Sequence, residues 1–401
     1  MESRMSALVW IAAIALALSL LAVATEVGVR RWLRRFGGYY VWSPGLRLHL
    51  HPDPEVFPGF ERRARIEINA DGERGDAVPH ADGGLYRILV AGGSPVECAL
   101  LDQPTSWPGV LQRLLETPKH LRALGASVVH VGNIGLSGVA SQSLNVILGR
   151  VLPRYRRLDL IVIMVGGNDV SDWLAKGAPP SVQRHAVPTR DIFSCHPEGP
   201  FSWKPRQLAV VQLLKGLRQR WLRPVKRHEA SGRWVGRART MRARAQEVRT
   251  AVADPSPMLR LFEEEFSELI RRAKRHAARV LVVRQPWFER DYTAEDLAHV
   301  WHGAAGNPQR EEVRAYYSVD VLCRLMALVS ERAAEVADAL GVEHLDVMPI
   351  LEPSLETFYD FVHFTPAGAA LVAEAVASAI LAPPIALERT GSGVSLSVGA
   401  E

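Results

Sequence analysis

The stretch LDLIVIMVGGNDVSDW, residues 158–173, decides the fold class of this chain. It begins with a nearly continuous run of Leu, Ile, Val and Met and ends in glycines and polar residues. Apolar runs of this length without polar alternation are typical of parallel strands that are buried on both faces of a sheet. The stretch therefore predicts a central parallel strand with polar residues just beyond its carboxyl end.

Similar apolar runs occur before and after this strand: YRILVA at 86–91, SVVHV at 127–131, RVLVVRQ at 279–285 and EHLDV at 343–347. Helical patterns lie between them, around 107–116, from about 311 to 340 and from 366. Strands that alternate with helices indicate a parallel sheet covered on both sides. We therefore expect a three-layer α/β/α sandwich of the flavodoxin-like kind.

The amino-terminal region contains a run that is long enough to cross a membrane. Residues Ser6 to Thr25 are almost entirely apolar and cover the about 20 residues that a transmembrane helix needs. A cleaved signal peptide is the alternative, with a loosely fitting cleavage site at Ala22 to Ala24. We interpret the run as an uncleaved anchor because of its length. The arginines that follow it would place the rest of the chain in the cytoplasm by the positive-inside rule.

With 401 residues and 48% hydrophobic content, the chain can form one main domain with additional segments. We expect the anchor and its basic flank at 1–38, a stalk with a small β-hairpin at 39–85, the main α/β domain at 86–385, a basic helical insertion within it at about 174–260, and a disordered tail at 386–401. Three scattered cysteines are too few for a disulfide framework and too far apart in sequence for a zinc site.

Positive charge is concentrated in one part of the chain. Between Lys204 and Arg249, fourteen Lys or Arg residues stand against two Glu, whereas the whole chain carries a formal net charge of only +5. This excess predicts contact with an anionic surface such as lipid headgroups or an acidic glycan. A solvated, Arg-rich pair of helices is the alternative. The stretch 204–249 lacks a recognisable nucleic-acid-binding motif, so we expect no nucleic-acid partner.

Three short polar segments follow predicted strands: Ser94 lies in AGGSPVE, Gly138 in GNIGLSGVAS and Asn168 in VGGNDVSDW. Ligands bind at the carboxyl ends of parallel strands in such folds. A serine hydroxyl there can act as a nucleophile, and the Ser94 and Gly138 amides and the Asn168 NH2 group can donate to an oxyanion. Each segment taken alone is more typical of a plain turn or a capped loop. Asp169 is expected to be a helix cap or an anchor for its loop.

A fourth segment, YDFVHFTPAG at 359–368, supplies a base and a carboxylate. Asp360 and His363 are three residues apart, so both side chains can lie on the same face of a helical turn or tight loop. The carboxylate can then bind one imidazole nitrogen while the other nitrogen meets the serine. Thr365 as N-cap and Pro366 in the first turn predict that a helix begins directly after this pair.

In this order, the four segments resemble the Ser, Gly, GxND and DxxH blocks of the SGNH/GDSL hydrolases, over about residues 86 to 381. The resemblance implies serine-based acyl transfer without a cofactor or metal. It assigns the nucleophile to Ser94, the base to His363 and the orienting carboxylate to Asp360. It also implies an oxyanion hole made by Ser94, Gly138 and Asn168.

One residue departs from the family pattern, because Gly93 stands where the name motif has Asp. The GxSxG pattern of other α/β hydrolases is absent, since GLSGV around Ser137 lacks the final glycine. The anchor, the stalk and FERRARIEINADGERG at 60–75 also resemble bacterial SGNH proteins associated with cell-surface polysaccharides. In those proteins the catalytic domain lies outside the cytoplasm.

The resemblance implies an esterase that hydrolyses an acyl ester, for example acetyl on a cell-surface glycan. Two alternatives remain open. Transfer of the acyl group to a sugar hydroxyl would make the protein an O-acyltransferase acting on a polysaccharide. A catalytically silent glycan-binding or assembly protein would keep the sheet and use the basic insertion to hold a partner.

Overall fold

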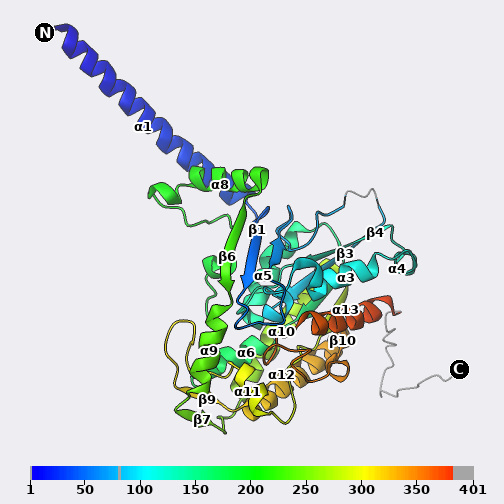
Figure 1. Cartoon of the computed structure of the whole chain (residues 1–401). Helices are drawn as coiled ribbons and strands as arrows, with labels where there is room; N and C mark the ends of the chain where they lie inside the picture. The colour runs from blue at the N-terminus through cyan, green and yellow to red at the C-terminus, as the bar shows by residue number, and fades with distance from the viewer. Residues whose placement is uncertain (1, 80–82, 383–401) are drawn as a thin grey trace.

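A five-stranded parallel sheet forms the centre of the computed structural model, which describes residues 2–79 and 83–382 (Figure 1). The strand order is β10-β8-β5-β3-β4, and every neighbouring pair is parallel. The strands are β3 (Leu85–Gly92), β4 (Val128–Asn133), β5 (Leu158–Met164), β8 (Ala277–Val283) and β10 (Glu343–Leu345). All five strands lie where the apolar runs predict them, and the order is that of flavodoxin-like folds.

Helices cover both faces of the sheet. One face packs against α5 (Ser141–Val151), α6 (Gly167–Ala175), α10 (Ser256–His276) and α12 (Val319–Ala339). The other packs against α3 (Trp107–Leu115) and α13 (Pro366–Leu381). Side chains alternate along β3, so that Leu89 lies in the first cluster and Ile88 in the second. The α/β/α sandwich is confirmed.

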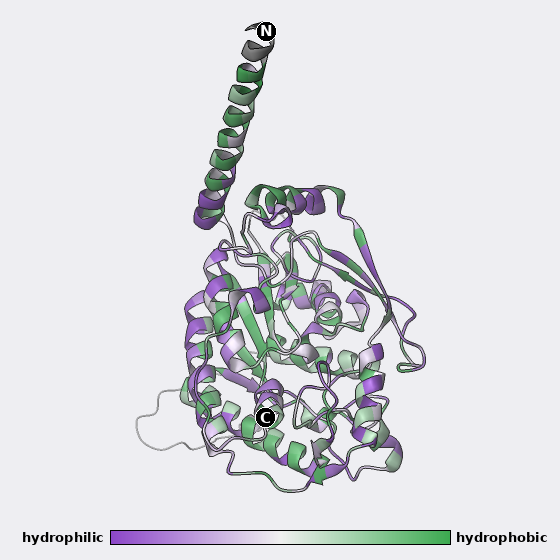
Figure 2. Cartoon of the chain, turned by 90° about the vertical axis from the view of Figure 1, so that its left-hand side faces the viewer, coloured by the Kyte–Doolittle hydropathy of each residue, from purple (hydrophilic) through white to green (hydrophobic). Residues whose placement is uncertain are grey.

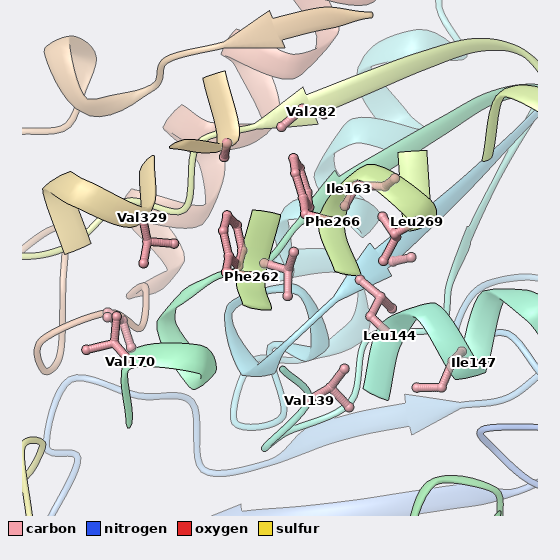
Figure 3. Close-up of a cluster of buried hydrophobic side chains, with 14 of the residues drawn as sticks. Val139, Leu144, Ile147, Ile163, Val170, Phe262, Phe266, Leu269, Val282 and Val329 are labelled. Atoms are coloured by element: carbon pink, nitrogen blue, oxygen red, sulfur yellow. The ribbon is translucent and has the colours of Figure 1, made fainter. Parts of the chain in front are cut away.

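The larger core cluster is centred on α10. Figure 3 shows Phe262 and Phe266 of this helix among side chains of the sheet, such as Ile163, and of α5, such as Leu144. The two phenyl rings stack with centroids 5.2 Å apart. Because these side chains are almost completely buried, they hold the sheet rigid beneath the loops at its carboxyl edge.

Shorter elements connect this framework. They are α2 (Ser94–Glu97), α4 (Pro118–Ala123), α7 (Thr189–Ile192), α11 (Ala294–His299) and the 3₁₀ turns at Gln103–Thr105, Leu152–Arg154, Pro205–Gln207 and Met348–Ile350. The helix expected from about 311 begins only at Val319, because Ser318 caps it by accepting the Val321 N–H. The residues before the cap form β9 (Ala315–Tyr317), which pairs with β7 (Glu247–Arg249).

A single long helix, α1 (Glu2–Phe36), precedes the domain and extends away from it (Figure 1). From Leu8 onward it is long and apolar enough to cross a membrane. Figure 2 shows that its apolar part is followed by a hydrophilic end next to the domain. This end, residues 26–36, contains the arginines and is called the foot of α1 below. Such a helix could serve as a signal sequence or as an anchor.

The segment 39–85 forms part of a second sheet. Strands β1 (Arg47–Pro52) and β2 (Ala64–Glu67) are antiparallel, and β1 also pairs in parallel with β6 (Val225–Ser231). Ile66 and Ile68 are almost fully buried. Residues expected to form a stalk therefore pack into the folded body.

The basic stretch 204–249 is only partly helical. Two helices, α8 (Ala209–Leu222) and α9 (Arg233–Ala243), lie on either side of β6, and β7 follows α9. The α9 arginines are not all solvated. Arg239 donates hydrogen bonds to the carbonyl oxygens of Val56, His299 and Tyr359, and Arg242 donates to those of His302 and Tyr317. The tail at 386–401, expected to be disordered, lies outside the described residues.

Candidate active site

Ser94 is the first residue of the single-turn helix α2, directly after β3. Gly93 is the N-cap residue, Pro95 occupies the first turn, and Cys98 ends the helix in the left-handed conformation with φ 50°. A chain that turns this sharply at the carboxyl edge of a sheet presents its first side chain above that edge. The Ser94 hydroxyl is thereby placed at the crevice predicted from the strand pattern.

Arg74 supports this turn from below. Its buried guanidinium donates to the carbonyl oxygens of Glu97, Cys98 and Leu101. Glu97 ends α2, Cys98 is its C-cap residue and Leu101 lies in the loop that follows, so these carbonyl oxygens lack partners within the helix. A residue of the 39–85 segment therefore satisfies the backbone around the turn that carries Ser94.

Ser94, His363 and Asp360 are connected by hydrogen bonds. The His363 Nε2 atom lies 2.7 Å from the Ser94 Oγ atom, and His363 Nδ1 lies 2.8 and 2.9 Å from the two Asp360 carboxylate oxygens. A proton on Nδ1 leaves Nε2 free to accept the hydroxyl proton of the serine. The loop 359–365, rather than a helical turn, holds this pair, and Thr365 caps α13 as expected.

The Asp360 carboxylate is fully buried and accepts three further hydrogen bonds besides those of the His363 ring. The backbone N–H groups of Val362 and His363 donate to Oδ1 at 3.0 Å each, and the indole N–H of Trp301 donates to Oδ2 at 2.9 Å. Burial alone would raise the pKa of Asp360, but the neighbouring His363 and these hydrogen bonds lower it well below its usual range. Asp360 is therefore ionised when it orients His363.

Gly138 and Asn168 lie beside Ser94 in the same pocket. Gly138 has φ +77°, which a residue with a side chain rarely adopts, and a Cβ atom there would meet open space. The Asn168 side-chain NH2 group donates to the Val139 carbonyl oxygen at 3.0 Å. A Cβ atom on Gly93 would lie 2.8 Å from this NH2 nitrogen. The glycine that departs from the family motif thus leaves room for Asn168.

A sequence profile of the GDSL-like lipase/acylhydrolase family matches residues 89–371. The chain belongs to this family. Within the family's region lie all five residues expected at the site, from Ser94 to His363. A comparison with curated protein sequences gave no significant match.

Several solved structures resemble this GDSL-like chain at low identity. An acetylxylan esterase from Geobacillus stearothermophilus is 15% identical, with 74% of this chain and 94% of that chain covered and a TM-score of 0.38. An α/β hydrolase from the metagenome of Lake Arreo, Spain, is 14% identical, with 74% and 97% covered and a TM-score of 0.40. A lipolytic protein of the G-D-S-L family from Veillonella parvula is 11% identical, with 73% and 97% covered and a TM-score of 0.37.

Buried polar side chains connect the segment that carries Ser94 to the segment that carries Gly138. The Glu97 carboxylate accepts the Ser137 N–H at 2.5 Å, and burial raises the pKa of Glu97. Asn133 donates to the Val96 carbonyl oxygen at 2.8 Å and accepts the Gly135 N–H at 2.7 Å. The loop that carries Gly138 is therefore fastened to the turn that carries Ser94.

Asp169 anchors its loop and, from outside the helix, accepts the first backbone N–H of α5. Its carboxylate accepts the backbone N–H of Ser141 at 3.0 Å and the hydroxyl of the same serine at 2.5 Å. Ser141 begins α5, so the contact ties the start of that helix to the loop after β5. Burial raises the pKa of Asp169 to about 7.

The pocket above Ser94 has a volume of about 280 Å³. Two tryptophans line it beyond the residues expected from the sequence: Trp301, and Trp234 of α9. Their rings form an edge-to-face pair with centroids 4.8 Å apart. The Trp301 ring also lies nearly parallel to the His363 ring, with an interplanar angle of 11°. The insertion therefore contributes directly to the wall of the pocket.

His302 is a buried polar neighbour of the site. Burial lowers its pKa to about 3, so the ring is neutral at neutral pH. The ring stacks on Trp301 with centroids 3.9 Å apart. Ligand atoms of His302, Asp360 and His363 lie within 4.8 Å of one another, a spacing that a metal ion could bridge. Asp360 and His363 are hydrogen-bonded to each other, and His363 is also hydrogen-bonded to Ser94.

The sequence pattern did not point to Trp301, Arg74 or Glu97. Trp301 is distant in sequence from the four segments, and only the path of the chain after α11 brings it to Asp360. The sequence offered one usable signal, because Glu97 is a charged residue in the otherwise apolar SPVECAL after the serine. A charged residue in such a position is seldom buried without a partner.

Proposed function

We propose that this protein is a serine esterase in which Ser94, His363 and Asp360 form a catalytic triad. The hydrogen-bonded chain from Asp360 through His363 to the Ser94 hydroxyl, which opens into a pocket, carries this proposal. Membership of a family of lipases and acylhydrolases supports the reaction class.

In the proposed mechanism His363 Nε2 takes the proton of Ser94 while the Oγ atom attacks the acyl carbonyl carbon. The carbonyl oxygen becomes an oxyanion that accepts from the Ser94 and Gly138 amides and from the Asn168 NH2 group. His363 then gives the proton to the leaving alcohol. Water, deprotonated by the same histidine, releases the acid from Ser94.

The proposed substrate is a small acyl ester, such as acetyl, on a glycan. A pocket of about 280 Å³ suits a short acyl group. Trp234 and Trp301 line this pocket as an aromatic pair, and aromatic faces offer apolar area on which the C–H face of a sugar ring can pack. The resemblance to polysaccharide-associated SGNH proteins favours the same substrate class.

We further propose that α1 stays in the membrane as an anchor and that the domain lies outside the cytoplasm. The apolar part of α1 has the length of a membrane span. The resemblance to surface-polysaccharide proteins favours a domain outside the cytoplasm, whereas the arginines at the foot of α1 favour the cytoplasmic side.

A fluorophosphonate probe tests the proposed nucleophile, because it modifies an activated serine covalently. We expect one adduct per chain on the peptide with Ser94, acetate release from an acetylated xylan or glucan, and loss of both in Ser94→Ala. Ser137→Ala is the matched control, since this serine also lines the pocket but does not contact His363. If Ser94→Ala, correctly folded, kept its labelling or its esterase activity within tenfold, Ser94 would not be the nucleophile.

A further inference from the structure

Helix α8 exposes a stripe of large apolar side chains on the surface of the protein. Leu214, Leu217, Trp221 and Leu222 are 59%, 42%, 84% and 68% exposed. The first three are spaced i, i+3 and i+7, so they lie along one face of the helix. Lys215 and Arg218 are exposed in the same stretch. An apolar stripe bordered by cations is typical of helices that lie in a membrane interface.

α8 is attached to the foot of α1. The N-cap residue is Leu208, whose apolar side chain cannot accept a hydrogen bond from the N–H groups of the first turn. The buried carboxylate of Glu26 in α1 does so instead, by accepting the Ala209 N–H at 2.7 Å and the Val210 N–H at 3.1 Å. Arg30 pairs with Glu26 at 2.7 Å. The direction of α8 is therefore fixed relative to α1, and Figures 1 and 2 both show it lying across the foot of that helix.

The contact at Glu26 also sets the depth of α8. Residues Leu8 to Thr25 are the apolar part of α1, and at 1.5 Å per residue they span about 27 Å, close to the thickness of a hydrocarbon core. Glu26 is the next residue, so α8 begins where that core would end. Exposed aromatic residues lie near α8: Trp32 and Phe36 of α1 line a pocket together with Leu217, and the exposed Trp203 ring lies 4.8 Å from the Arg30 guanidinium. Tryptophan is enriched in membrane proteins where the hydrocarbon core ends.

We propose that α8, with Trp203, rests in the surface of a phospholipid bilayer. The stripe Leu214, Leu217 and Trp221 lies among the upper acyl chains, while Lys215 and Arg218 meet lipid phosphates. Of the basic stretch 204–249, which was expected to contact an anionic surface, α8 is then the part that makes the contact. The α9 arginines Arg239 and Arg242 point into the protein instead. The proposal rests on α1 remaining in the membrane and is independent of esterase activity.

Thiol accessibility in the full-length protein tests the proposal. Leu214→Cys is compared with Val248→Cys in β7, because the native side chains are equally exposed, at 59% and 58%. Figure 1 places β7 at the end of the molecule opposite α8. The protein is reconstituted at one copy per nanodisc of phosphatidylcholine and phosphatidylglycerol. A membrane-impermeant maleimide is added, and mass spectrometry of the peptide with the new thiol gives the labelling rate without interference from the native cysteines.

We expect Leu214→Cys to react at least about tenfold more slowly than Val248→Cys, because an apolar environment raises a thiol pKa by one unit or more and only the thiolate reacts. Trp221→Cys should be protected in the same way, which guards against a local defect at one position. Equal rates at 214, 221 and 248 would overturn the proposal. Protection that appears only with two copies per nanodisc would also overturn it, because the stripe would then bind a second copy of the chain.

Discussion

Replacing Asn168 by Ala tests whether its NH2 group stabilises an oxyanion or only holds a loop. In the structure the group donates to the Val139 carbonyl oxygen at 3.0 Å. Asn168 is the second residue of α6, and the N-cap of that helix is Gly166, so a capping role is excluded. Two roles therefore remain: donation to the substrate, and a tether on the loop that carries Gly138.

The two roles differ in magnitude and in the quantity that they affect. Loss of a tether would lower the free energy of unfolding by about 0.5–1.5 kcal/mol, the net contribution of an ordinary hydrogen bond. Loss of an oxyanion donor would raise the activation free energy by about 2.7–4 kcal/mol, which lowers kcat roughly a hundredfold to a thousandfold with little change in KM. We therefore expect Asn168→Ala to lose kcat by that factor while it remains folded.

The assay is hydrolysis of a p-nitrophenyl ester, combined with urea unfolding of the same samples. Asn145→Ala is the matched control, because this asparagine donates to Glu265 at 2.9 Å and lies outside the pocket. It should lose stability without losing kcat. Asn168→Asp should be at least as slow as Asn168→Ala, because a carboxylate repels both the oxyanion and the Val139 carbonyl. An Asn168→Ala kcat within tenfold of wild type would refute the donor role.

Three further predictions concern the support of the site and its location. Trp301→Phe removes the hydrogen-bond donor to Asp360. It should lower kcat about tenfold or more, because hydrogen bonds to charged groups are worth about 1.5–3 kcal/mol. Trp234→Phe should keep kcat and serves as the control, because Trp234 makes no such bond to Asp360. The raised pKa of Asp169 means that the folded state keeps a proton that the unfolded chain releases between pH 3.8 and about 7. Wild-type stability in urea should therefore fall as pH rises through this window, and Asp169→Asn should remove that dependence; an unchanged pH profile would contradict it. Alkaline phosphatase fused after the carboxyl terminus should be active in cells, whereas an inactive fusion together with a fluorescent GFP fusion would place the domain in the cytoplasm.

The sequence predicted those features of the fold and the site that depend on a local pattern of residues. Buried strands such as 158–164 need unbroken apolar runs, and ends of parallel strands need turns, so the sheet and the positions of Ser94 and Asn168 could be predicted. The Asp360–His363 pair could be predicted because three residues of separation bring both side chains to one face.

Other features depended on contacts between distant parts of the chain. Trp301 and Asp360 are 59 residues apart, and no periodicity connects them. The net charge of 204–249 was visible, yet the hydrogen bonds of Arg239 to carbonyl oxygens and the exposure of Arg218 depend on how α8 and α9 pack. A count of charges cannot distinguish an arginine that binds carbonyl oxygens from one that faces solvent or lipid.

Arg74 shows that the working unit of this enzyme is longer than the region it shares with its family. The family match begins at residue 89, but the guanidinium that holds the end of α2 comes from fifteen residues earlier in the chain. A protein trimmed to the shared region would take the Arg74 donor away from the carbonyl oxygens of Glu97 and Leu101, whereas that of Cys98 would keep the Leu101 N–H. During synthesis the segment that supplies this support leaves the ribosome before the turn that needs it. Recombination that exchanges catalytic domains between relatives would have to carry both pieces together.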